Sequence, residues 1–196
     1  MASERQRAKL FGMDRFSFVM VLLSIIVGLG VTEILTNIAR QIQERRTSKF
    51  YWLHAVLVAL VFVALLQQWW ESWDQRAVES WTFPILLLML GGPIGIYIIS
   101  HLLYPASLKG ADYRAHYYES PRITYITAAI AVIFAGTYRP ISFGHNLIDP
   151  DNIATAIVLM VFLILVFTKR KIVHEILVPL LFAVVLMDVL LFHWAI

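Results

Sequence analysis

Residues 16–38 read FSFVMVLLSIIVGLGVTEILTNI, an apolar stretch interrupted by a single carboxylate, Glu33. At 1.5 Å per residue a helix of this length extends roughly 35 Å, which is enough to cross the hydrocarbon core of a bilayer. A soluble domain rarely contains so long an apolar run. The stretch therefore predicts a transmembrane helix.

The rest of the chain repeats this pattern with short connections. Of the 196 residues, 60% are hydrophobic and 15% are charged, whereas soluble domains carry about 25% charged residues. This composition excludes a soluble enzyme and a nucleic-acid-binding domain. We predict an all-α, polytopic integral membrane protein with six transmembrane helices: Phe16–Ile38, Tyr51–Trp73, Phe83–Tyr104, Ile123–Tyr138, Ile153–Thr168 and Ile172–Trp194.

The six predicted helices form one domain that spans residues 1–196. Residues 1–15 form a basic N-terminal tail, and residues 105–122 form the one loop long enough for structure of its own, which we expect at the membrane interface. Alternate loops hold ten of the sixteen basic residues. By the positive-inside rule, both termini are expected outside the cell, in a bacterial inner (plasma) membrane.

Glu33 and Asn37 lie on one face of the first predicted helix, because four residues make about one helical turn. A carboxylate at this depth must be paired, wetted or protonated. Two interpretations stay open: structural pairing with a basic residue or histidine of a neighbouring helix, and a place in an ion or proton path. Further candidates for such a path are Asp188, Gln68 and Glu71.

The third predicted helix contains Gly91, Gly92, Pro93 and Gly95 at its centre. Proline removes an amide donor and clashes with the preceding turn, while glycine lowers the cost of unwinding. We expect a kink or a break that acts as a hinge. A broken helix would expose backbone carbonyls in the way that transporter substrate sites do.

Small residues recur every fourth position in the first predicted helix, at Ser24, Gly28 and Thr32. This spacing lets helices approach closely, so the three residues are predicted to pack against another helix. Ala131 and Ala135, beside Gly136, show the same spacing in the fourth predicted helix and are also predicted to pack against another helix.

Two segments match each other when the chain is shifted by 120 residues. His54 and Gln68 then fall on His174 and Asp188, with several aliphatic matches between them. Parallel internal repeats occur in transporters, although a chain rich in leucine and valine produces such matches by chance.

Histidine is the commonest metal ligand, and His54, His101 and His174 are weak candidates for a metal or haem site. Their spacing does not match a known metal motif, and the chain has no cysteine. We therefore predict no cofactor. The sequence also lacks the nucleotide-binding and hydrolase motifs that would indicate an enzyme.

These features favour a small ion- or proton-conducting membrane protein, a channel or channel-like transporter that forms a homo-oligomer in the lipid bilayer. The alternative from another class is a structural or regulatory membrane subunit that docks onto a partner membrane protein through its small-residue and tryptophan-rich faces. A histidine-ligated redox module is the third hypothesis. No nucleic-acid partner is expected.

Overall fold

A computed structural model describes residues 15–78, 81–119, 121–143 and 150–192, so the basic tail at residues 1–15 lies almost entirely outside the described residues. The described chain is helical and contains no strand. Its elements are α2 (Arg15–Gln43), α3 (Trp52–Glu71), the 3-10 helix η1 (Ser72–Ala77), α4 (Phe83–Leu102), α5 (Tyr113–Glu119), α6 (Pro121–Phe143), α7 (Pro150–Phe167) and α8 (Lys171–Phe192).

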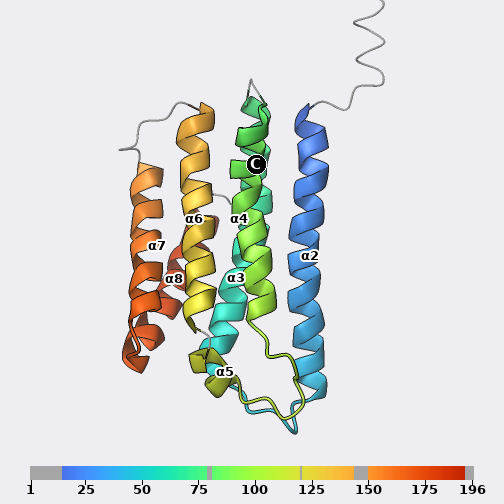
Figure 1. Ribbon diagram of the computed structural model, residues 1–196, viewed down its shortest axis with the longest axis vertical. Coiled ribbons are helices and arrows are strands. Elements are labelled where there is room, and N and C mark those ends of the chain that lie inside the picture. Colours follow the sequence, from blue (N-terminus) through green and yellow to red (C-terminus); the bar gives the residue numbers. More distant parts are fainter. Residues whose placement is uncertain (1–14, 79–80, 120, 144–149, 193–196) are drawn as a thin grey trace, which may run out of the picture.

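The six long helices form a bundle of two layers (Figure 1). Helices α7, α6, α4 and α2 stand in a row, in which α4 and α6 make the most extensive contact. Helix α3 lies behind this row and packs against α2, α4 and α8. Contacts join the starts of α3 and α8, at Tyr51 and Glu175, and also their far ends, at Gln67 and Asp188, so these two helices run parallel.

The described part of each of the six predicted spans lies in a helix. Among the described residues four helices are long and apolar enough to cross a membrane, by length and composition: Phe16–Gln43, Trp52–Ala77, Phe83–Leu102 and Lys171–Leu190. The prediction of six spans is therefore supported in part. The described apolar part of α7, Asn152–Phe167, is shorter. Helix α6 includes Arg122 and several threonines and tyrosines among its apolar residues.

The middle of the bundle is apolar. Leu23 on α2, Leu65 on α3 and Val178 on α8 are fully buried, and further leucine, valine and tyrosine side chains continue this core. Close packing of these side chains, with van der Waals contact between the helices, holds the helices together.

Helix α4 runs without interruption through the glycine–proline cluster, with Pro93 inside it, so the break considered from the sequence does not form. Its glycines instead allow close approach of α6. A Cβ at Gly91 would lie 2.3 Å from Phe134 Cγ, and a Cβ at Gly95 would lie 2.6 Å from Ala131 Cβ. The neighbouring helix covers the segment, as transmembrane helices that contain glycine and proline require.

The segments that precede α3 and α5 lie side by side at one end of the bundle (Figure 1). The backbones of Lys49 and Asp112 pair in a single parallel β-bridge. Their side chains form an ion pair, in which Lys49 Nζ lies 3.2 Å from Asp112 Oδ2. The other oxygen, Asp112 Oδ1, accepts from the backbone N–H groups of Arg114 and Ala115 at 3.1 Å each and so caps α5. The hydrogen bond from the Ala115 amide has the largest effect on the pKa of Asp112 and lowers it. Lys49 and the Arg114 amide lower this pKa further. Helix α5 is thereby fixed within the predicted 105–122 loop.

Candidate functional site

Three clusters hold many of the polar side chains that the structure describes. The Glu33 cluster comprises Glu33, Asn37 and His101, and the Asp188 cluster comprises Gln67, Glu71 and Asp188. The tyrosine–histidine cluster comprises Tyr51, Tyr117, Tyr118, Tyr125 and His174.

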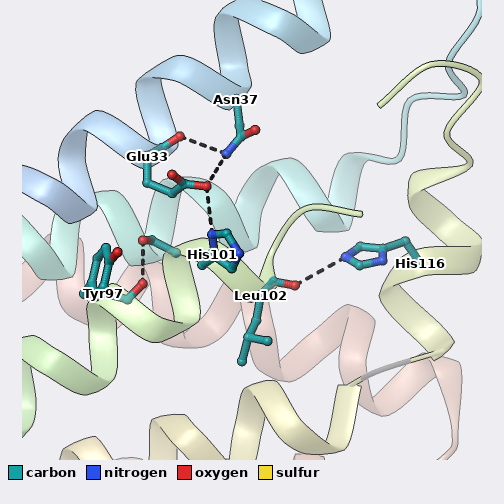
Figure 2. Close-up of polar contacts among 7 residues, drawn as sticks. Glu33, Asn37, Tyr97, His101, Leu102 and His116 are labelled. Atoms are coloured by element: carbon teal, nitrogen blue, oxygen red, sulfur yellow. Dashed lines mark hydrogen bonds and ion pairs between the residues drawn. The ribbon is translucent and has the colours of Figure 1, made fainter. Parts of the chain in front are cut away.

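The Glu33 cluster joins α2 to α4 (Figure 2). Glu33 Oε1 accepts from Asn37 Nδ2 at 2.8 Å and lies 3.1 Å from His101 Nδ1. The Asn37 amide also donates to the Glu33 backbone carbonyl at 3.0 Å. Because a carboxylate accepts, the imidazole nitrogen that faces it carries the proton. The contact is that of a glutamate paired with a histidine of a neighbouring helix.

The pair lies near one end of the bundle, as expected of structural pairing near the membrane interface. His101 lies in the last turn of α4, while α2 continues ten residues beyond Glu33 to Gln43, roughly 15 Å further. The Glu33 side chain is 31% exposed and that of His101 is 74% exposed. Glu33 therefore lies level with the end of α4, where the connecting segments begin, and not at the centre of the bundle.

We expect Glu33→Gln to lower the free energy of unfolding by less than about 1 kcal/mol, because partly exposed ion pairs contribute little. Thermal unfolding in detergent measures this change in stability, and the flux of ions or protons in liposomes tests for a role in conduction. His101→Gln should add no further loss in the Glu33→Gln background, since the same contact is already gone. A large change in flux per assembled protein, with stability unchanged, would instead assign Glu33 to a conduction path.

The Asp188 cluster lies at the opposite end of the bundle. Gln67 Nε2 donates to Glu71 Oε1 at 2.9 Å and to Asp188 Oδ2 at 2.6 Å, and thus bridges α3 and α8. Gln68, which the 120-residue shift aligned with Asp188 and which was a predicted path residue on this helix, faces α4, where its Oε1 would lie 3.2 Å from a Cβ at Gly92. Adjacent helical positions differ by 100°, so the missed residue, Gln67, could be found only once the parallel packing of α3 and α8 was known.

The residues proposed for one ion path are thus divided between two ends. The buried side chains of α3 between these ends are aliphatic, and include Leu57, Val61 and Leu65. The hydrogen bonds given above for each cluster join residues at the same end of the bundle. The structure does not bring Glu33 and Asp188 together.

The predicted packing residues Ser24, Gly28 and Thr32 lie on the exposed face of α2. A Cβ at Gly28 would meet no atom within 4 Å, and Ser24 Oγ accepts from the indole Nε1 of Trp69 at 3.2 Å. Close packing inside the chain occurs elsewhere, between α4 and α6 and between α6 and α7, where a Cβ at Gly136 would lie 2.7 Å from Thr155. The small-residue face of α2 is directed away from the bundle.

The tyrosine–histidine cluster lies at the same end as Glu33 and contains a chain of buried hydrogen bonds. His174 Nε2 lies 2.9 Å from the carbonyl oxygen of Thr168, so this nitrogen is the donor. Its Nδ1 then accepts from the Tyr117 hydroxyl at 3.2 Å, and Tyr117 in turn accepts from Tyr125 at 2.6 Å. Burial, followed by the neighbouring Tyr125, raises the pKa of Tyr117, so its hydroxyl keeps the proton that it donates.

Two further histidines contact the carbonyl end of α4. His54 Nε2 lies 2.8 Å from the Leu103 carbonyl oxygen, and His116 Nε2 lies 3.3 Å from that of Leu102 (Figure 2). Helix C-termini leave carbonyls without intrahelical donors, and these imidazoles supply the missing N–H groups. Of the weak metal candidates, His54 and His174 bind carbonyls and His101 faces Glu33. The residues that the structure describes include no group of three metal-ligating side chains.

A small pocket lies between the start of α3, the end of α4, α5 and α6. Its volume, with the adjoining open solvent included, is about 300 Å³, and its polar lining consists of His54, His116, Tyr117, Thr124 and Tyr125. The pocket accommodates water or a small polar group against the imidazole and hydroxyl side chains.

Comparison of the chain with protein families, curated proteins and solved structures found no match.

Proposed function

We propose that the protein is a structural or regulatory membrane subunit that docks onto another membrane protein, with the six long helices crossing the bilayer and the α5 end on the cytoplasmic side. The positive-inside rule supports this orientation. The observation that carries the proposal is the outward face of α2, where Ser24, Gly28 and Thr32 are exposed and a Cβ at Gly28 would meet no atom of the described residues within 4 Å. Small residues permit close backbone approach of a second helix in lipid.

Exposed tryptophans extend this face. Trp69 donates its indole N–H to Ser24, and the ring of Trp73 lies 6.4 Å from that of Phe16 in an edge-on arrangement. Both tryptophan side chains are nevertheless nearly half exposed. Aromatic side chains with a polar edge suit a protein contact near the membrane surface.

The placement of the polar clusters supports docking over conduction through the bundle itself. The Glu33 and Asp188 clusters lie at opposite ends, and the α3 core between them is aliphatic. An ion that passed between α2, α3 and α4 would lose its hydration without finding polar partners, which costs several kcal/mol or more. Conduction through a single copy is therefore disfavoured.

Gly28→Leu is expected to weaken association at least tenfold while the fold persists, because the Cβ position is open within the chain. Native mass spectrometry of the complex extracted from its own membrane measures the fraction bound, and Leu29→Ile on the same helix is the control. Unchanged association in Gly28→Leu would contradict docking through this face.

Conduction along the axis of a homo-oligomer remains a second candidate, because exposed hydroxyl residues on α2, Ser24, Thr32 and Thr36, would then line a shared pore. The two candidates differ in partner and in flux. A stoichiometric complex with a different membrane protein, and no flux from the purified chain, supports docking. A homo-oligomer that conducts ions in liposomes supports the channel. A histidine-ligated haem module is disfavoured, because His54 and His174 already bind backbone carbonyls.

A further inference from the structure

Two basic side chains lie over a pair of tyrosine rings at the α5 end of the bundle. The Arg114 guanidinium carbon of α5 is 5.9 Å from the centre of the Tyr51 ring, and Lys171 Nζ of α8 is 5.6 Å from the centre of the Tyr118 ring. The hydroxyls of Tyr51 and Tyr118 are 3.0 Å apart. The two tyrosines therefore form a platform flanked by two cations, which we term the Arg114–Lys171 platform.

This platform carries excess positive charge. Arg114 and Lys171 are exposed, and within the described part of the chain neither forms an ion pair, whereas Lys49 pairs with Asp112. Arg170, next to Lys171, is also exposed. The acidic neighbour, Glu175, accepts a hydrogen bond from Tyr51 at 3.4 Å. Cations held over aromatic faces remain available to an anion from the solvent side.

Large apolar side chains are exposed next to the platform. Phe50 and Trp52 flank Tyr51 in the sequence, and Ile172 follows Lys171. Their exposed fractions are 71%, 45% and 70%. Aromatic and aliphatic side chains beside cations are typical of the lipid interface, where the apolar groups enter the acyl region and the cations meet phosphate.

We propose that the Arg114–Lys171 platform binds the phosphate of an anionic phospholipid headgroup. A free phosphate ion would use the same charged contacts. The exposed Phe50, Trp52 and Ile172 favour the lipid, because they would contact its acyl chains and would gain nothing from a soluble anion. This site is independent of the α2 face, so its test does not depend on the docking proposal.

The experiment measures binding of phosphatidylglycerol and phosphatidylcholine to the purified full chain by native mass spectrometry. Each Lys or Arg near the lipid phosphate contributes to anionic-lipid binding, and removal of one is expected to weaken it about fivefold. Arg114→Gln and Lys171→Gln should each show this loss, and the double variant about 25-fold. Binding of the zwitterionic lipid should be weaker than that of the anionic lipid and should change little.

Arg76→Gln is the matched control, because the Arg76 guanidinium lies 4.6 Å from the centre of the Trp73 ring at the other end of the bundle. It should leave phosphatidylglycerol binding unchanged. Arg114→Lys and Lys171→Arg keep the charge and should retain binding, which separates charge loss from misfolding. Equal binding of the two lipids, or full binding in the double variant, would overturn the proposal. Equally tight binding of inorganic phosphate alone would overturn the lipid as the ligand.

Discussion

Gly91→Ala and Gly95→Ala are each expected to lower the free energy of unfolding by roughly 1–3 kcal/mol, with the two together failing to assemble normally. At Gly91 a new Cβ would lie 2.3 Å from Phe134 Cγ and 2.8 Å from its Cβ. These atoms are close to the backbone, so rotation of the phenyl ring does not relieve the clash. At Gly95 the obstacle is Ala131, whose Cα would lie 3.3 Å away. Either substitution must push α6 away from α4.

Two other glycines provide matched controls for this prediction. A Cβ at Gly28 meets nothing within 4 Å, and a Cβ at Gly92 lies 3.2 Å from the terminal oxygen of Gln68, which can rotate away. The free energies of unfolding of Gly28→Ala and Gly92→Ala should therefore lie within about 0.5 kcal/mol of that of the parent protein. Thermal unfolding in detergent and the yield of monodisperse protein measure all four variants. Equal losses at all four positions would show that a general effect of alanine, and not the α4–α6 contact, is responsible.

His174→Leu is the second change with a large expected effect, a loss of about 2–4 kcal/mol. The imidazole is almost fully buried and makes a contact through each nitrogen. Leucine would leave the Thr168 carbonyl and the Tyr117 hydroxyl without this partner, and each unsatisfied buried group costs about 1–3 kcal/mol. Helices α5, α7 and α8 should then separate first. Hydrogen exchange should rise at residues 113–119 and around Thr168.

The hydrogen-bond chain allows a stricter comparison between two tyrosines. Tyr117→Phe removes a buried hydroxyl that contacts both Tyr125 and His174, whereas Tyr118→Phe removes a half-buried hydroxyl that contacts Tyr51. We expect Tyr117→Phe to cost at least 1 kcal/mol more than Tyr118→Phe in the same unfolding measurement. Similar losses for the two tyrosines would contradict the network as drawn.

The continuous α4 changes the interpretation of the glycine–proline cluster. A break would have supported a substrate site, whereas an intact helix packed against α6 gives Gly91 and Gly95 a structural role. Bending of α4 at Pro93 during a functional cycle stays a prediction. Flux or partner binding in Pro93→Ala would address it.

Local properties of the sequence determined the helices of this protein. Apolar runs of about 20 residues identify helices whatever their neighbours, because backbone hydrogen bonds close within each helix and hydropathy is a property of the run itself. For the same reason the sequence placed Glu33 and Asn37 on one helical face, and the two side chains are hydrogen-bonded. It also placed a structured segment between residues 105 and 122, where α5 forms.

Only the tertiary structure decided which face of each helix meets which neighbour. Small residues signal close approach without identifying the partner, so Gly28 faces outward while Gly91 and Gly95 pack against α6. Likewise Gln67, and not Gln68, reaches Asp188, because the rotation of α3 is set by its simultaneous contacts with α2, α4 and α8. The Gln67–Asp188 contact joins residues 121 positions apart, and the local properties of the sequence that define each helix carry no record of it.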